Sequence, residues 1–150
     1  MTAAMTAQVW IAILVGLAAV VDDLKRGHIA NWISVAALAG GFGWQAGQFG
    51  WRGGLYALGG AAAGFGVFLI FYLLGGMGGG DIKLMAGFGA LLGAGRLLEA
   101  ALWTAGAGGV IALAVIAVRR LRHIPSSRQE TIPYAPAIAL GVWLSLIPKG

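Results

Sequence analysis

Residues 75–87 read GGMGGGDIKLMAG and place an aspartate and a lysine directly after a run of glycines. The segments on both sides are apolar, so this stretch is expected to end one helix and begin the next. A carboxylate at the start of a helix can act as a cap, because it accepts hydrogen bonds from the first free N–H groups and complements the helix dipole. The alternative explanation is that the carboxylate of Asp81 takes part in a chemical reaction.

The composition predicts a membrane protein. Of the 150 residues, 59% are hydrophobic and only 10% are charged, and the mean hydropathy is +0.86, which is too high for a soluble domain. The chain has no cysteine, which excludes a disulfide framework and a thiolate metal site. The net charge of +5 is better explained by membrane topology than by nucleic-acid binding, because no basic stretch is interleaved with aromatic residues.

The apolar runs indicate an all-α fold, a polytopic membrane helix bundle with about six transmembrane helices in a single integral-membrane domain, residues 1–150. Each run is compared with the roughly 20 apolar residues that span a bilayer. The first run lacks the basic start of a signal peptide, so it is expected to be a retained helix. The run that begins at Asp81 is short and opens with charges, so both a full and a partial span stay open. The predicted helices cover residues 1–21, 30–51, 54–74, 81–95, 100–118 and 131–148.

The distribution of lysine and arginine predicts the orientation. If the first hinge is cytoplasmic, seven of the ten basic residues face the cytoplasm and three face outward. This arrangement places both termini outside and brings Asp23 and Asp81 to the cytoplasmic face. The inward set is Lys25, Arg26, Lys83, Arg119, Arg120, Arg122 and Arg128, and the outward set is Arg52, Arg96 and Lys149.

Small residues at a spacing of four predict closely packed helices. The glycine pairs with this spacing are Gly43 and Gly47, Gly60 and Gly64, and Gly89 and Gly93.

The few acidic residues narrow the possible chemistry. The chain has five, Asp22, Asp23, Asp81, Glu99 and Glu130. Adjacent residues on a helix point about 100° apart, so only one of the first two is expected to face a site shared with Asp81. The glycines fit neither a phosphate-binding loop nor a dinucleotide fingerprint. Two carboxylates that share a proton, beside a loop that lets a substrate backbone approach, are the machinery of aspartic proteolysis.

Three blocks of sequence resemble those of the prepilin peptidase family. The members of this family are membrane aspartic proteases with a GxGD signature. Residues 78–93, GGGDIKLMAGFGALLG, resemble the signature block. Residues 23–32, DLKRGHIANW, resemble the family's segment after the first helix. This alignment favours Asp23 over Asp22 as the family's aspartate and also matches Arg26, Ile29 and Asn31. The chain has Ala30 where the family usually has a proline. Residues 132–141, IPYAPAIALG, are similar to the block that opens the last helix.

The resemblance implies roles for eight residues. Asp23 and Asp81 would be the catalytic aspartates, and no metal or cofactor is expected. Gly78 and Gly80 would shape the loop at the site. Four more residues match family positions near the same face: Arg26, Asn31, Lys83 and Tyr134. They could orient the substrate, but simpler roles are also open, namely setting the membrane topology or forming hydrogen bonds at helix ends.

The family cleaves the short charged leader of type IV pilin-like precursors, just before their hydrophobic segment, at the cytoplasmic face of the inner membrane. Longer members also N-methylate the new amino terminus and carry paired CxxC motifs between the first two helices. This chain has no cysteine and only a short first hinge, residues 22–30, so it resembles the peptidase-only form that serves tight-adherence (Flp) pili. We therefore expect a prepilin-like protein substrate and no methyltransferase activity.

Three alternatives stay open. An archaeal preflagellin peptidase is similar in motif. A small membrane transporter also places aspartates among glycine-broken helices, but it should show paired broken segments in two halves. A non-enzymatic assembly subunit should tolerate replacement of Asp23 or Asp81 by asparagine.

Overall fold

The computed structural model describes residues 3–74, 76–123 and 132–147, and in these residues the chain forms four α-helices and no strand. Three of the helices are long and apolar enough to cross a membrane, and the fourth is short and apolar. This architecture confirms the predicted all-α membrane helix bundle. The helices are α1 (Ala3–Arg26), α2 (Asn31–Leu73), α3 (Gly79–Leu121) and α4 (Ala135–Ser145).

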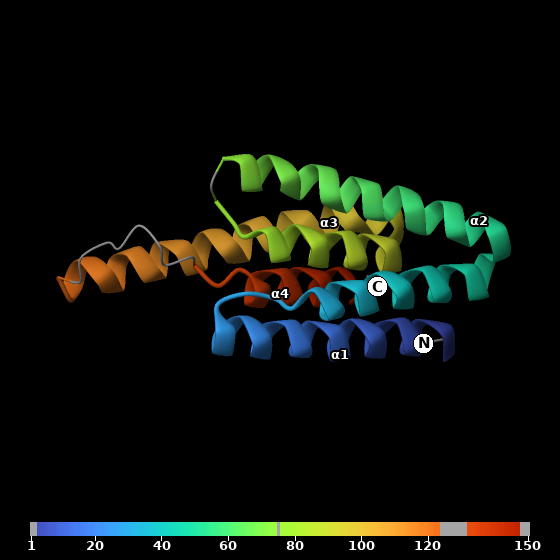
Figure 1. Cartoon of the computed structure of the whole chain (residues 1–150), viewed down its shortest axis with the longest axis horizontal. Coiled ribbons are helices and arrows are strands. Elements are labelled where there is room, and N and C mark those ends of the chain that lie inside the picture. The colour runs from blue at the N-terminus through green and yellow to red at the C-terminus, as the bar shows by residue number, and fades with distance from the viewer. Residues whose placement is uncertain (1–2, 75, 124–131, 148–150) are drawn as a thin grey trace.

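Two of the long helices are interrupted by a glycine. A straight helix of the 43 residues in α2 or α3 would be about 65 Å long, twice the hydrocarbon thickness of about 30 Å. Instead, α2 departs from helical geometry at Gly50 (φ 60°) and α3 at Gly93 (φ 73°), conformations that favour glycine. The chain doubles back near the same end of the bundle in both helices (Figure 1). The two stretches of α2 correspond to predicted runs 30–51 and 54–74, and those of α3 to 81–95 and 100–118. How many of them cross the membrane stays a prediction.

The first stretch of α3 is the centre of the bundle. All residues from Leu84 to Gly93 are buried, as expected of a helix that is apolar on every side. This stretch contains the predicted run 81–95, for which a partial span of the membrane stayed open. Its burial fits its many glycines and alanines, because small side chains let the neighbouring backbones approach closely.

Glycine contacts confirm part of the predicted close packing. A Cβ on Gly60 would overlap the carbonyl oxygen of Gly89, and one on Gly64 would lie 2.5 Å from the carbonyl oxygen of Met85. The prediction was wrong for Gly43 and Gly47, where an added Cβ would meet nothing within 4 Å. Their spacing of four puts them on one face of α2, but no helix of the described chain packs against that face as closely.

The bounds of α1 and α4 differ most from the prediction. α1 continues beyond residue 21 to Arg26, because Asp22 and Arg26 form an ion pair one turn apart at 3.0 Å and basic residues in the last turn complement the helix dipole. Its end is marked by Gly27 at φ 70°, whose N–H donates to the carbonyl of Asp23 at 2.8 Å. α4 is shorter than the predicted run 131–148, whose first and last residues lie outside the described residues.

Candidate active site

A pocket of about 150 Å³ brings Asp23 and Asp81 together at one end of the bundle. Its walls come from four parts of the chain: the last turns of α1, the loop into α2, the loop that leads into α3, and the segment before α4. Both aspartate side chains are buried, each residue being 7% exposed. The pocket is lined by Asp23, Gly27, His28, Ile29, Gly78, Gly79, Gly80, Asp81 and Ile132.

Asp81 lies in the first turn of α3 and caps it. Its Oδ2 accepts a hydrogen bond of 3.0 Å from the N–H of Gly78, the residue that precedes the helix. The sequence predicted that Asp81 caps the helix that begins after it, but the helix begins two residues earlier and Asp81 caps it from the third helical position. This role is compatible with a chemical one because the same carboxylate lines the pocket.

Gly80 lets the start of α3 lie against the loop between α1 and α2. A Cβ added there would lie 3.2 Å from the Cβ of Ile29 and 3.3 Å from its backbone nitrogen and oxygen. That distance is tighter than ordinary van der Waals contact. A larger residue would push Asp81 away from the wall that carries Asp23.

Asp23 lies in the last turns of α1 and is held from the far end of the chain. Its Oδ2 accepts a hydrogen bond of 3.2 Å from the N–H of Ala135, the first residue of α4. Such a bond offsets part of the cost of burying a carboxylate. Among the described residues, no group donates a hydrogen bond to Oδ1 of either aspartate.

The arrangement suits a reaction that two carboxylates perform together. Asp23 and Asp81 line the same pocket. In each of them Oδ2 accepts a backbone hydrogen bond, and the part of the chain that the structure describes leaves Oδ1 open to a ligand. A pocket of about 150 Å³ is larger than the roughly 30 Å³ that one water occupies in the liquid. The pocket therefore has room for a water molecule beside a peptide carbonyl.

Asp22 has a structural position outside the pocket. Its Oδ1 pairs with Nε of Arg26 at 3.0 Å, and its Oδ2 accepts the N–H of Ala30 at 2.8 Å. These contacts hold the turn between α1 and α2. Arg26, expected near the site, is turned toward Asp22 with its side chain 65% exposed, and it does not line the pocket.

Asn31, Lys83 and Tyr134 also lie outside the aspartate pocket. The ammonium of Lys83 donates to Oδ1 of Asn31 at 3.0 Å, an exposed bond that joins the start of α3 to the start of α2. Tyr134 lines a separate apolar pocket between α2, α3 and α4. The structure therefore brings together four of the eight expected residues, Asp23, Gly78, Gly80 and Asp81, and leaves the other four around them.

The sequence analysis missed several groups in the pocket. His28 was unassigned, and its Nδ1 lies 3.1 Å from the carbonyl oxygen of Arg26. The N–H of Ala135 could not be recognised because any residue supplies one. Gly27 carried a usable signal, since a glycine after a basic helix end is typical of a helix C-terminus. Within the described residues no group of three or more histidine, cysteine, aspartate or glutamate side chains could hold a metal ion; metal-free activity stays a prediction.

Fold and pocket together define a helical membrane protein with a pair of buried aspartates at one end of its bundle. Residues 10–113 match the type IV leader peptidase family, and the chain belongs to that family. It is also similar to the prepilin leader peptidase/N-methyltransferase of Bacillus subtilis (strain 168), with 37% identity over 90 residues. That alignment covers 59% of this chain and 34% of the relative, so the chain matches about a third of that protein's length. No solved structure matches the chain.

Membership of this family confirms the resemblance predicted from the sequence, and two of the three blocks, residues 23–32 and 78–93, lie within the match. The matched residues 10–113 include Asp23 and Asp81 but end before the segment that contains Tyr134 and Ala135.

Proposed function

We propose that this chain is an aspartic endopeptidase that removes the leader peptide of type IV prepilin-like precursors, with Asp23 and Asp81 as the catalytic pair. The observation that carries the proposal is the meeting of these two buried carboxylates in one glycine-walled pocket, in a chain that belongs to the type IV leader peptidase family.

In the proposed mechanism the two aspartates share one proton. The ionised carboxylate removes a proton from a water molecule while the water oxygen attacks the carbonyl carbon of the scissile peptide. The protonated carboxyl donates its proton to the carbonyl oxygen, which gives a tetrahedral diol. The diol then collapses and the C–N bond breaks: the leaving nitrogen takes a proton from the aspartate that had accepted one from water, while a hydroxyl of the diol gives its proton to the other, ionised aspartate, which restores the shared proton. No metal ion takes part.

We place the pocket at the cytoplasmic face of the inner membrane. The C-terminal end of α1 and both ends of α3 lie toward one end of the bundle (Figure 1). The pocket is lined by Asp23 at the end of α1 and by Asp81 at the start of α3. Five of the ten lysines and arginines lie in these helix ends, and Arg122 directly follows α3. The five are Lys25, Arg26, Lys83, Arg119 and Arg120. Both α2 and α3 double back at the other end of the bundle (Figure 1). The excess of basic residues favours the cytoplasm for the pocket end.

We propose peptidase activity without methyltransferase activity. The relative in Bacillus subtilis is named for both, but this chain has no cysteine and joins α1 to α2 through residues 27–30 alone, which leaves no room for a cysteine-containing region there.

The test is co-expression with a candidate prepilin precursor. Leader removal is compared for wild type, Asp23→Asn and Asp81→Asn, with Asp22→Asn as the matched control, after each variant is shown to reach the membrane. The amide of the control variant would keep an oxygen that accepts the Ala30 N–H, so this variant is expected to cleave. Loss in the other two alone supports the proposal, and cleavage that survives in both ends it in favour of a transporter or an assembly subunit.

Treatment with a metal chelator adds a second test. Cleavage by purified protein is expected to continue in excess EDTA, because the aspartates activate water without a Lewis acid. Activity that is lost with EDTA and restored by a divalent cation would contradict the proposed mechanism.

A further inference from the structure

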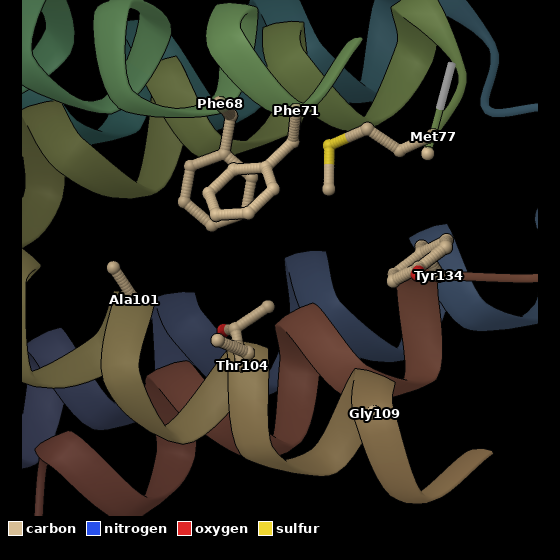
Figure 2. Close-up of a pocket in the computed structure, with 9 residues that line it drawn as sticks. Phe68, Phe71, Met77, Ala101, Thr104, Gly109 and Tyr134 are labelled. Carbon is tan, nitrogen blue, oxygen red and sulfur yellow. The ribbon is translucent and has the colours of Figure 1, made fainter. Parts of the chain in front are cut away.

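A second pocket lies beside the candidate active site and is apolar. It encloses about 170 Å³ between the end of α2, the second stretch of α3 and the start of α4. Figure 2 shows Phe68, Phe71 and Met77 on one side of it, facing Ala101, Thr104 and Gly109 on α3, with Tyr134 at one end. Gly76 and Ala105 complete its lining.

The two pockets share their walls. The glycine-rich loop contributes Met77 to the apolar pocket and the next residue, Gly78, to the aspartate pocket. At the start of α4, Tyr134 lines the apolar pocket, and the N–H of the next residue, Ala135, holds the carboxylate of Asp23. A peptide bound across Asp23 and Asp81 would therefore have the apolar pocket next to it.

The size and chemistry of the pocket fit one large apolar side chain. A cavity of about 150 Å³ lined by apolar residues can hold a benzene molecule, and this one is slightly larger. Phe68 and Phe71, with ring centroids 6.0 Å apart and planes tilted by 51°, form an aromatic wall against which a ring or a branched aliphatic chain can pack. The opposite wall leaves room because Ala101, Ala105 and Gly109 are small.

We propose that this pocket binds the first large apolar side chain of the precursor on the retained side of the scissile bond, and so sets the cleavage position. This inference rests on the proposed function. The retained side is favoured because the removed leader is charged, whereas the segment that follows the cleavage site is hydrophobic. The position agrees, since Phe68 and Phe71 lie on the last turns of α2, within the helix and before the glycine loop that follows it.

Gly109 offers a way to fill the pocket without disturbing the backbone. It lines the pocket, and an added Cβ there would meet nothing within 4 Å. Gly106, on the same stretch of α3, also has open space around an added Cβ but does not line the pocket. Gly109→Leu and Gly106→Leu therefore form a matched pair with the same gain in helix propensity and the same added volume.

The experiment measures kcat/KM for precursors that carry phenylalanine, leucine or alanine directly after the scissile bond. Wild type is expected to prefer the two large residues over alanine by about tenfold or more, the selectivity that a hydrophobic pocket achieves. Gly109→Leu should lose most of this preference while it still cleaves the alanine precursor, and Gly106→Leu should keep the wild-type profile. Phe71→Ala enlarges the pocket and should raise the relative rate for a precursor with tryptophan at this position.

The inference is overturned if neither Gly109→Leu nor Phe71→Ala changes the preference, or if Gly106→Leu changes it as much. A pocket that holds only a lipid chain would give that unchanged profile. Failure of the proposed function has a different signature, because then wild type cleaves no precursor or Asp81→Asn cleaves as wild type does; that result overturns the pocket assignment as well.

Discussion

A single methyl group at Gly64 should separate the two helices that position Asp81. The Cβ of Gly64→Ala would lie 2.5 Å from the carbonyl oxygen of Met85 and 3.0 Å from its carbonyl carbon. Ordinary contacts between carbon and oxygen begin at about 3.3 Å, so the second stretch of α2 and the first stretch of α3 must move apart by about 0.8 Å. Met85 lies one turn after Asp81, and the displacement is therefore expected to reach the candidate active site.

Two effects of this displacement can be measured. Overpacking of a close-packed core costs about 1–3 kcal/mol of folding free energy, which should lower the midpoint of thermal unfolding in detergent by several degrees. A misplacement of about 1 Å in a catalytic group can cost about 100-fold in rate, so cleavage of a precursor is expected to fall between about 10-fold and 100-fold.

Gly66→Ala is the matched control for this prediction. Gly66 is exposed on the same stretch of α2, and an added Cβ there would meet nothing within 4 Å. This variant should be as stable as wild type or up to about 1 kcal/mol more stable, because alanine favours a helix over glycine. If Gly64→Ala unfolds and cleaves as wild type does, or if both variants suffer equally, the close approach of α2 and α3 is not what positions Asp81.

Two further predictions concern the contacts around the pocket. Asp22→Ala removes the acceptor for the N–H of Ala30 and should cost about 1 kcal/mol of stability while leaving measurable cleavage; a stable variant without any activity would show that Asp22 acts in the chemistry. Asn31→Ala and Lys83→Met each remove the same 3.0 Å hydrogen bond. The double variant should therefore be no less stable than the less stable of the two single variants, and thermal unfolding should give a coupling energy of at least about 0.5 kcal/mol. Purely additive effects would indicate that the bond contributes nothing.

The helical runs were predictable because their signals are local. Apolar length and charged interruptions placed both stretches of α2 and of α3 close to their observed limits. The same signals failed at Asp22 and Asp23, because a charged residue looks like a hinge in sequence although an ion pair to Arg26 keeps the last turn helical. The spacing of four correctly placed Gly60 and Gly64 at a helix–helix interface but was wrong for Gly43 and Gly47. Such a spacing shows that two glycines lie on the same face of a helix, but it does not show whether another helix packs against that face.

The pair of aspartates was predictable from residue chemistry and from the family resemblance, but much of their surroundings was not. The contact between Ala135 and Asp23 joins residues 112 positions apart through a backbone group, which leaves no mark in the sequence. The apolar pocket is formed by residues of α2, of α3 and of the glycine-rich loop, together with Tyr134 directly before α4. Most of them are small or apolar, and none stands out in its own segment. Arg26 matched a family position, yet a nearby acid determines where its side chain lies.

The hydrogen bond from Ala135 to Asp23 also bears on when the protein acquires its site during synthesis. The first aspartate is translated early, but its backbone partner and the pocket residue Ile132 come more than a hundred residues later. A nascent chain that already contains both aspartates therefore lacks part of the pocket until α4 has been made and has docked. Contacts this distant in sequence form late in folding. The order of synthesis thus delays completion of the pocket until the segment around Ile132 and Ala135 has been made.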